Sequence, residues 1–312
     1  MNTEIKDPSN LAESAAKTDA EEFLHLVETF RRFSTNEERQ VRNWQTTGRL
    51  AEVSARHETI IVGDVHGDLE SLTHILKDSS FLAKADSDEG VLLIFLGDYG
   101  DRGVHSPEVY YVVLKLKELF PNQVVLMRGN HEGPDDLLAY PHDLPSHLQR
   151  KFGRDSSRIY EKIRGLFNLL YNGVVIEDRC ILLHGGAPSH ATTRGDVAYA
   201  HEKHPKEPHL EEILWSDPVD GMKGAYRSPR GAGKLFGEDI TDKILSIFNV
   251  NALIRGHESS AKGYKTNHHG KVLTLFSRKG PPYFNEQGAY LLVDSFEEIR
   301  DANQLLKYIR KF

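Results

Sequence analysis

The sequence predicts an α/β fold in which two mixed β-sheets pack as a sandwich and are flanked by helices. First, from residue 57 onward, short apolar runs of strand length recur, and each ends in a turn that combines glycine with Asp, Asn or His. Second, helix-like segments over residues 69–77 and 107–120 separate the first three runs, which is a βαβαβ alternation. Third, the later runs at 271–276 and 289–293 lack long helices between them, which predicts a second sheet packed on the first.

The first 56 residues carry no such runs. Residues 1–19 are polar without a clear period, so we expect a flexible tail. Residues 20–33 place apolar side chains at helical spacing, and Ser34 with Glu37 has the spacing of a capping box. The spacing predicts a helix over 20–33, a second one through about Val53, and therefore a helical region over residues 20–56.

Five apolar runs in the remaining chain, residues 57–312, each end in residues that can bind a metal. Each run is rich in Val, Ile and Leu, as expected for a buried strand, and the following glycine permits a sharp turn. In α/β sheets, ligands bind just beyond the carboxyl ends of the strands. The runs span residues 59–62, 91–96, 124–127, 180–183 and 252–254.

Composition argues against several classes of protein. With 312 residues, 39% hydrophobic and 27% charged, the chain has the make-up of a soluble globular protein. The longest apolar run, at 91–96, is far shorter than a membrane span, so no membrane association is expected. The formal net charge of -7 argues against nucleic acid as a partner.

The single cysteine, Cys180, makes an intramolecular disulfide impossible and excludes a cysteine-based zinc site. Because it begins an apolar run, we expect a buried thiol rather than a nucleophile. The first residues lack the basic and apolar pattern of a secretory signal. Together these features predict a reducing, cytoplasmic location.

The strand-end residues form a set that suits two hard divalent cations, which prefer carboxylate, amide and imidazole ligands. A pair of cations needs a bridging carboxylate. Each residue alone has about one chance in ten of being a ligand, because most such residues are turn or cap residues. Their joint occurrence in five strand-end loops has no comparable structural explanation. The set is Asp64, His66, Asp98, Asn130, His184 and His257.

These segments resemble the signature motifs of the phosphoprotein phosphatase family, whose members include protein phosphatase type 1 and calcineurin. Five segments in order match, over about residues 59–294, although the continuation after Glu132 looks more like prokaryotic, particularly archaeal, members. The segments are Gly63-Asp-Val-His-Gly67, Gly97-Asp-Tyr-Gly-Asp-Arg-Gly103, Gly129-Asn-His-Glu132, His184-Gly-Gly186 and Arg255-Gly-His257.

The resemblance implies a calcineurin-like metallophosphoesterase fold with residues 57–312 as the catalytic domain. It implies a serine/threonine protein phosphatase that acts on phosphoprotein substrates and uses two divalent metal ions, manganese first and iron or zinc as alternatives. It assigns Asp64, His66 and Asp98 to the first metal. It assigns Asp98, Asn130, His184 and His257 to the second metal.

The resemblance also implies Arg102 and Arg230 as phosphate clamps, with Asn130 beside them and Tyr283 on the substrate side. Two cations lower the pKa of the water that they share, so direct attack on phosphorus needs no covalent intermediate. The leaving alkoxide is very basic and needs a proton. His131 is the candidate general acid, and Asp101 is the carboxylate that orients it.

Several alternatives stay open. Dinucleoside polyphosphate hydrolases of the diadenosine tetraphosphate type share the metal motifs. A non-enzymatic phosphoprotein scaffold and a nuclease are less favoured, because every ligand is present and the chain is acidic. Asp68 replaces the Gln or Asn of eukaryotic members, and it either changes the electrostatics of the site or caps the next helix.

Overall fold

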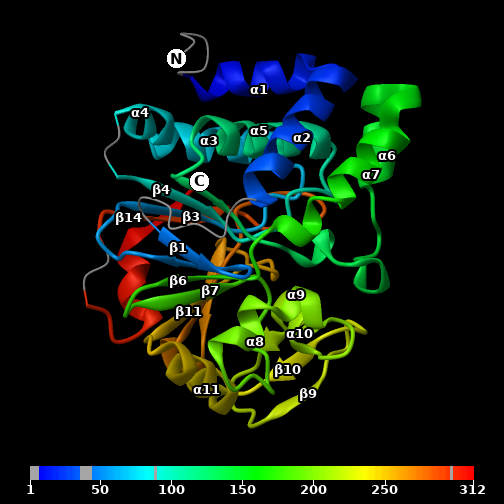
Figure 1. The fold of residues 1–312 in the computed structure, drawn as a ribbon. Helices are drawn as coiled ribbons and strands as arrows, with labels where there is room; N and C mark the ends of the chain where they lie inside the picture. The colour runs from blue at the N-terminus through cyan, green and yellow to red at the C-terminus, as the bar shows by residue number, and fades with distance from the viewer. Residues whose placement is uncertain (1–6, 36–43, 88–89, 296–297) are drawn as a thin grey trace.

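Two β-sheets lie face to face between two helical layers in the computed structural model, which describes residues 7–35, 44–87, 90–295 and 298–312 (Figure 1). Apolar side chains from both sheets, among them Ile61, Ile94, Leu182 and Leu273, form one buried cluster between them. The predicted α/β sandwich is therefore correct.

The five-stranded sheet has the order β15-β14-β3-β4-β5. Its strands β3, β4 and β5 are parallel, and the helices between them confirm the predicted βαβαβ alternation. The strands are β3 (Thr59–Val62), β4 (Leu92–Phe95), β5 (Val124–Leu126), β14 (Ala289–Val293) and β15 (Ile309–Lys311), and the connecting helices are α3 (Leu69–Asp78), α4 (Phe81–Asp86) and α5 (Ser106–Leu119).

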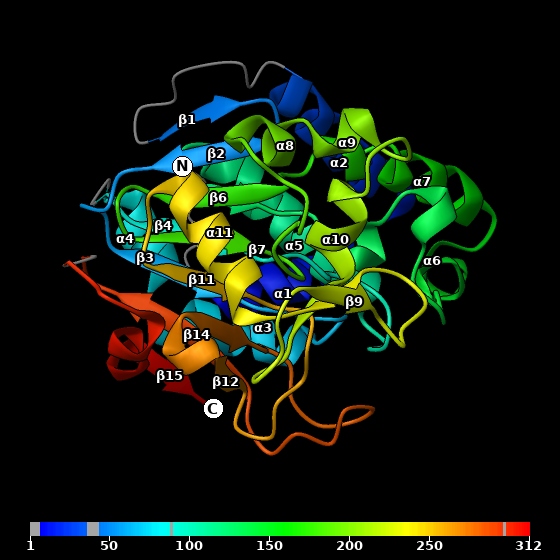
Figure 2. The same ribbon diagram turned by 90° about the horizontal axis from the view of Figure 1, so that it is seen from below.

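The second sheet has seven strands in the order β1-β2-β6-β7-β11-β13-β12, and Figure 2 shows the first five of them side by side. A separate three-stranded sheet has the order β8-β10-β9. The bounds are β1 (Trp44–Thr47), β2 (Leu50–Val53), β6 (Gly173–Ile176), β7 (Cys180–Leu183), β8 (Asp217–Pro218), β9 (Ala225–Arg227), β10 (Lys234–Phe236), β11 (Ala252–Arg255), β12 (Tyr264–Asn267) and β13 (Val272–Leu275).

Helices cover the outer face of each sheet. One buried cluster joins the five-stranded sheet to the helices on its side, and another joins the seven-stranded sheet to the helices below it. No helix of the described residues is long and apolar enough to span a bilayer. The remaining helices are α1 (Pro8–Lys17), α2 (Ala20–Thr35), α6 (Leu144–Phe152), α7 (Ser156–Arg164), α8 (Arg194–Ala198), α9 (Ala200–Lys203), α10 (His209–Trp215) and α11 (Glu238–Phe248).

The strand at 289–293 corrects one expectation, because it belongs to the first sheet and not to the second. It pairs antiparallel with β3, where Tyr290 lies opposite Val62 and Leu291 opposite Ile61. Four of its five residues are buried. A strand with both faces covered suits this inner position beside β3.

The expected flexible tail over residues 1–19 is wrong for residues 8–17, which form α1. The Asp7 side chain accepts a hydrogen bond from the backbone N–H of Ser9, and Pro8 occupies the first helical position. Leu11 and Ala15 are buried, and the Lys151 ammonium donates to the carbonyl oxygens of Ala15 and Ala16. Two apolar side chains four residues apart thus pack this helix against the domain.

The helix predicted over 20–33 is confirmed as α2, but the second helix, through Val53, is wrong from Trp44 onward. Its part over 36–43 lies outside the described residues. Residues 44–53 form the hairpin β1–β2, and β2 pairs in parallel with β6. That pairing partner lies more than a hundred residues further along the chain, so local sequence patterns do not reveal it.

Candidate active site

The loops after β3, β4, β5, β7 and β11 bring the six predicted metal ligands together in the interior. All six side chains are buried, and His257 is the most exposed at 8%. His66, Asp98 and His257 have positive φ values of 46°, 55° and 71°. A positive φ is strained for residues other than glycine, and such strain concentrates where side chains must point at a site.

The backbone fixes the orientation of two of the histidine rings. His66 Nδ1 lies 2.9 Å from the carbonyl oxygen of Gly100, and His184 Nδ1 lies 2.9 Å from that of Leu96. Because a carbonyl only accepts, each Nδ1 carries a proton, and Nε2 is the ring atom that faces the other ligands. Both Nε2 atoms face Asp98, at 3.4 Å from Oδ2 for His66 and 3.4 Å from Oδ1 for His184.

Asp98 therefore joins two groups of possible metal ligands. One group contains His66, Asp98 and His131, and the other contains Asp98, His184 and His257; within each, the ligand atoms lie within 4.8 Å of one another. Asp64 lies beside both groups. Its Oδ2 atom lies 3.8 Å from His66 Nε2, and its carboxylate accepts from the backbone N–H of His257.

The chemistry of the donor set fits a divalent cation. The side-chain amide of Asn130 lies 3.0 Å from His184 Nε2 and 3.0 Å from His257 Nδ1. Carboxylate, amide and imidazole groups, the ligand types that such cations prefer, therefore converge on one buried point. His257 Nε2 is buried without a hydrogen-bond partner among the described residues.

Burial and the nearby carboxylates shift the pKa values of several of these side chains. Burial opposes a charged His184, but the nearby Asp98 carboxylate outweighs it and raises the pKa of His184 to about 9. Burial, together with Asp98, raises the pKa of Asp64 to about 7. Burial lowers the pKa of His66 to about 3, against the attraction of Asp98. Burial opposes a charged Asp98, but nearby His184 outweighs it and lowers the pKa of Asp98, so Asp98 stays ionised and able to bind a cation.

His131 and Asp101 form the predicted acid pair. The distance from His131 Nδ1 to Asp101 Oδ2 is 2.6 Å, and both side chains are buried. Burial opposes the charged imidazole, but Asp98 and Asp101 together raise the pKa of His131. Burial also opposes a charged Asp101, yet its hydrogen bonds with His131 and His142 lower the pKa of that carboxyl.

The predicted phosphate-binding side chains surround a cavity of about 330 Å³ that opens onto these ligands. Arg102 donates to the carbonyl oxygens of Pro141 and Tyr140, at 3.0 and 3.1 Å. Arg230 donates from Nε to Asp217 at 2.6 Å. Tyr283 stacks on the His66 ring with centroids 5.5 Å apart, so all three side chains expected from the sequence line the cavity together with Asn130.

A family model described as Calcineurin-like phosphoesterase matches residues 58–260 of this chain, which is well over half of its length. The chain belongs to this family. The fold and the metal-ligand groups around Asp98 agree with that membership.

Two curated relatives are phosphatases by name. The chain is 33% identical over 260 residues to a probable serine/threonine-protein phosphatase of Encephalitozoon cuniculi, which covers 80% of the chain but 54% of that protein. It is 33% identical over 219 residues to the serine/threonine-protein phosphatase 4 catalytic subunit of Candida glabrata, which covers 70% of the chain and 67% of that protein. Both relatives are eukaryotic, so neither supports the expected kinship to archaeal members.

Two solved structures share the fold. A protein serine/threonine phosphatase from Saccharomyces cerevisiae superposes with a TM-score of 0.73 at 24% identity, over 95% of this chain and 90% of that one. A cold-active protein-tyrosine phosphatase of a Shewanella species superposes with a TM-score of 0.54 at 22% identity, over 80% of this chain and 78% of that one.

Several residues that hold this phosphoesterase site were missed from the sequence. Glu132 is fully buried and accepts hydrogen bonds from the backbone N–H groups of Asp98, Tyr99 and Gly129 and from the Tyr110 hydroxyl. It ties the loop after β4 to the loop after β5. Its position after Asn130 and His131 is the one signal that the sequence offered.

Asp217 and His142 were also missed. Asp217 accepts from Arg230 at 2.6 Å and from the fully buried Arg255 at 3.0 Å, so it fixes the side of the cavity that Arg230 lines. His142 contacts the same oxygen of Asp101 as His131 does. A lone Asp or His in a loop carries no pattern that marks such a role.

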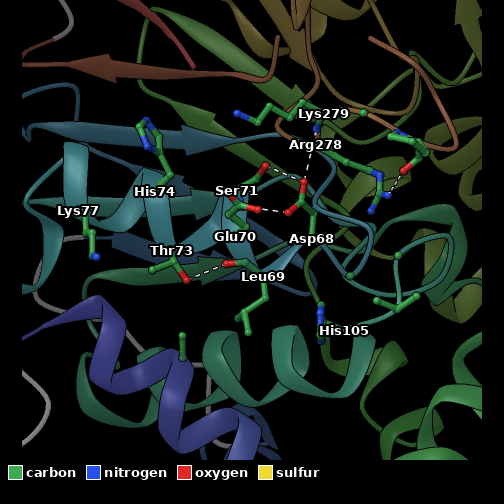
Figure 3. Close-up of a pocket in the computed structure, with 16 residues that line it drawn as sticks. Asp68, Leu69, Glu70, Ser71, Thr73, His74, Lys77, His105, Arg278 and Lys279 are labelled. Carbon is green, nitrogen blue, oxygen red and sulfur yellow. Dashed lines mark hydrogen bonds between the residues drawn. The ribbon is translucent and has the colours of Figure 1, made fainter. Parts of the chain in front are cut away.

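A larger cavity, of about 790 Å³, lies behind the metal loops between α1, α3 and the 278–281 segment, and Figure 3 shows its lining. Asp68 lies in it and accepts from the Ser71 N–H at 3.0 Å and the Ser71 hydroxyl at 2.6 Å. Asp68 therefore caps α3, the simpler of the two roles considered for it. None of the predicted metal ligands lines this cavity.

Proposed function

We propose that this chain is a metal-dependent serine/threonine protein phosphatase that acts on phosphoprotein substrates. One observation carries the proposal: a cluster of metal-ligating side chains around Asp98 lies in one small cavity with the His131–Asp101 pair and two arginines. Metal-assisted hydrolysis of a phosphate monoester uses these three parts. The names of the two curated relatives support the same substrate class.

We propose that Asp64, His66 and Asp98 hold one divalent cation, and that Asp98, Asn130, His184 and His257 hold another, with manganese as the first choice. Divalent cations in such a site supply Lewis-acid chemistry, which activates the attacking water and neutralises phosphate charge. The chain supplies a rigid ligand set, because the Gly100 and Leu96 carbonyls fix the rings of His66 and His184.

His131 is the proposed general acid. Its Nδ1–H is bound to Asp101, so Nε2 is the ring atom left to deliver a proton to the leaving alkoxide. The raised pKa favours the charged, proton-donating form, and the Asp101 carboxylate stabilises it. No cysteine takes part, since Cys180 is buried and its pKa is raised by burial.

Arg102 and Arg230 are the proposed phosphate clamps. Their planar guanidinium groups suit the oxygens on which charge accumulates in phosphoryl transfer. Each donates through only some of its N–H groups to the protein, at Tyr140 and Pro141 for Arg102 and at Asp217 for Arg230, so further donors remain for substrate.

Turnover of four substrates tests the proposal: a phosphothreonine peptide, the matched phosphotyrosine peptide, p-nitrophenyl phosphate and diadenosine tetraphosphate. The reactions contain manganese, with a chelator control. We expect the highest kcat/KM for the phosphothreonine peptide and none after chelation. Faster turnover of the dinucleotide establishes the alternative from the sequence, and preference for phosphotyrosine moves the chain toward the Shewanella enzyme in substrate class.

We also propose a cytoplasmic location and phosphoproteins as partners. A lone buried thiol agrees with a reducing cytoplasm. The acidic composition agrees with protein rather than nucleic acid as the partner.

A further inference from the structure

The segment 140–144 wraps around the two adjacent residues Asp101 and Arg102. The carbonyl oxygens of Tyr140 and Pro141 accept from the Arg102 guanidinium, and the Asp143 carboxylate accepts from the Arg102 N–H at 3.1 Å. The Asp143 and Leu144 N–H groups donate to Asp101 Oδ1, both at 2.7 Å. Five consecutive residues thus contact the proposed acid pair and the proposed phosphate clamp.

His142, in the middle of this segment, places a second imidazole on Asp101. Its Nδ1 lies 2.8 Å from Asp101 Oδ2, the same oxygen that His131 Nδ1 approaches at 2.6 Å. A carboxylate offers about four lone-pair positions, and these two imidazoles and two backbone N–H groups fill them all. Asp101 is therefore fully hydrogen-bonded in one orientation.

Tyr160, on α7, holds the second ring nitrogen of His142. The Tyr160 hydroxyl lies 3.0 Å from His142 Nε2. Because the Asp101 carboxylate only accepts, it requires the proton on Nδ1, and in a neutral ring Nε2 then accepts from the hydroxyl. Without the hydroxyl, the imidazole loses one of its two anchors and is oriented less firmly toward the carboxylate. The His142 side chain is only 11% exposed, so water replaces the hydroxyl poorly.

We propose that His142, held by Tyr160, is a positioning residue that fixes Asp101 and, through it, the His131 ring. The proposal rests on the proposed function, because it assumes that His131 delivers the proton. On this proposal, His142 affects proton delivery to the leaving group and does not affect phosphate binding by Arg102. Arg102 stays bound to main-chain carbonyls of residues 140 and 141 whatever side chain stands at position 142.

Two substitutions at position 142 test the role. His142→Leu keeps the bulk but removes the donor, whereas His142→Asn leaves an N–H near the place of Nδ1. We expect His142→Leu to lower kcat for a phosphothreonine peptide by about 10–100-fold, the usual loss for a residue that orients a catalytic ligand. KM should stay near wild type. The loss on p-nitrophenyl phosphate should be much smaller, because nitrophenolate leaves without a proton.

The conservative variants complete the experiment. His142→Asn should recover most of the lost kcat, and Tyr160→Phe, which keeps the ring, should reproduce part of the leucine defect on the phosphopeptide only. Equal losses on both substrates, or identical behaviour of the leucine and asparagine variants, overturn the proposal and leave His142 as a structural residue. The wild-type rate on the phosphopeptide, measured alongside, reports separately whether the proposed function holds.

Discussion

The metal half and the phosphate half of the site are built differently. The six proposed ligands lie within four residues of a strand end and are buried, and hydrogen bonds to the backbone orient two of the imidazoles. The phosphate half uses Arg102, Arg230 and Tyr283, which lie on loops, and the Arg230 side chain is 38% exposed. The strand ends therefore hold the proposed metal ligands, whereas loops present the proposed phosphate-binding side chains.

This difference implies that damage to the two halves has different consequences. Loss of a buried ligand removes the cations and with them every activity. Loss of a loop residue weakens one substrate interaction and leaves the metal in place. The variants below sharpen that contrast, beginning with the largest expected effect on turnover.

Asp98→Asn should abolish turnover of every substrate, by about 10⁴-fold. Asp98 belongs to both ligand groups, and each cation contributes several kcal/mol to stabilisation of the transition state. Bound manganese, measured by elemental analysis, should fall below that of the wild type. The matched control is Asp68→Asn, which should stay within a few-fold because asparagine caps a helix as well as aspartate. Similar losses in the two variants would falsify the placement of the site.

His131→Asn should lower turnover of a phosphothreonine peptide by about 10²–10⁴-fold, because the alkoxide departs poorly without a proton. The loss on p-nitrophenyl phosphate should be smaller, and bound metal should stay near the wild-type content. Loss of metal instead assigns His131 as a ligand, in line with its place in one ligand group. His105→Asn, at an exposed histidine, is the control.

Arg230→Lys should lower kcat/KM by about 10–100-fold, since hydrogen bonds to charged groups contribute about 1.5–3 kcal/mol. Lysine keeps the positive charge but lacks the planar set of N–H donors of arginine and its hydrogen bond from Nε to Asp217. Metal content should not change. Arg227→Lys, at an exposed position on the same hairpin, should behave as wild type. If both variants are equally active, Arg230 does not contact phosphate.

Leu11→Ala should leave kcat and KM unchanged but lower the free energy of unfolding by about 2–5 kcal/mol. Leu11 is 1% exposed and belongs to the core that joins α1 to α5 and α3. Urea unfolding followed by circular dichroism measures the change. Ser14→Ala, on the exposed face of α1, is the control, and equal stability of the two variants shows that α1 does not support the domain.

The strands and the candidate metal ligands could be predicted from the sequence, because both are marked by residues that are neighbours in the chain. Each of the five apolar runs is a strand, and each proposed ligand lies in the cluster, because short buried runs followed by glycine and a polar residue leave few alternatives. Cys180 is buried as expected. The roles of the individual ligands stay predictions, since their chemistry is still to be measured.

The misses share a physical cause, which is dependence on distant contacts. For β2 the sequence predicts helix, because Leu50 and Val53 are buried in clusters on the two faces of a sheet that β2 joins by pairing with the distant β6. For β14 it predicts the second sheet, because nothing near residue 290 specifies β3 as its partner. His142 acquires its role only when the loop after β5 folds over Asp101.

The long separation between the ligands also affects how the protein is made. The hydrogen bonds from His257 to Asp64 join residues 193 positions apart in the chain. At about 5–20 residues per second, roughly 10–40 s pass between synthesis of the first and of the second on the ribosome. During that interval the nascent polypeptide contains Asp64, His66 and Asp98 but neither His257 nor β14, the strand beside β3. We therefore expect metal loading to be a late step of maturation, which follows synthesis of His257 and β14.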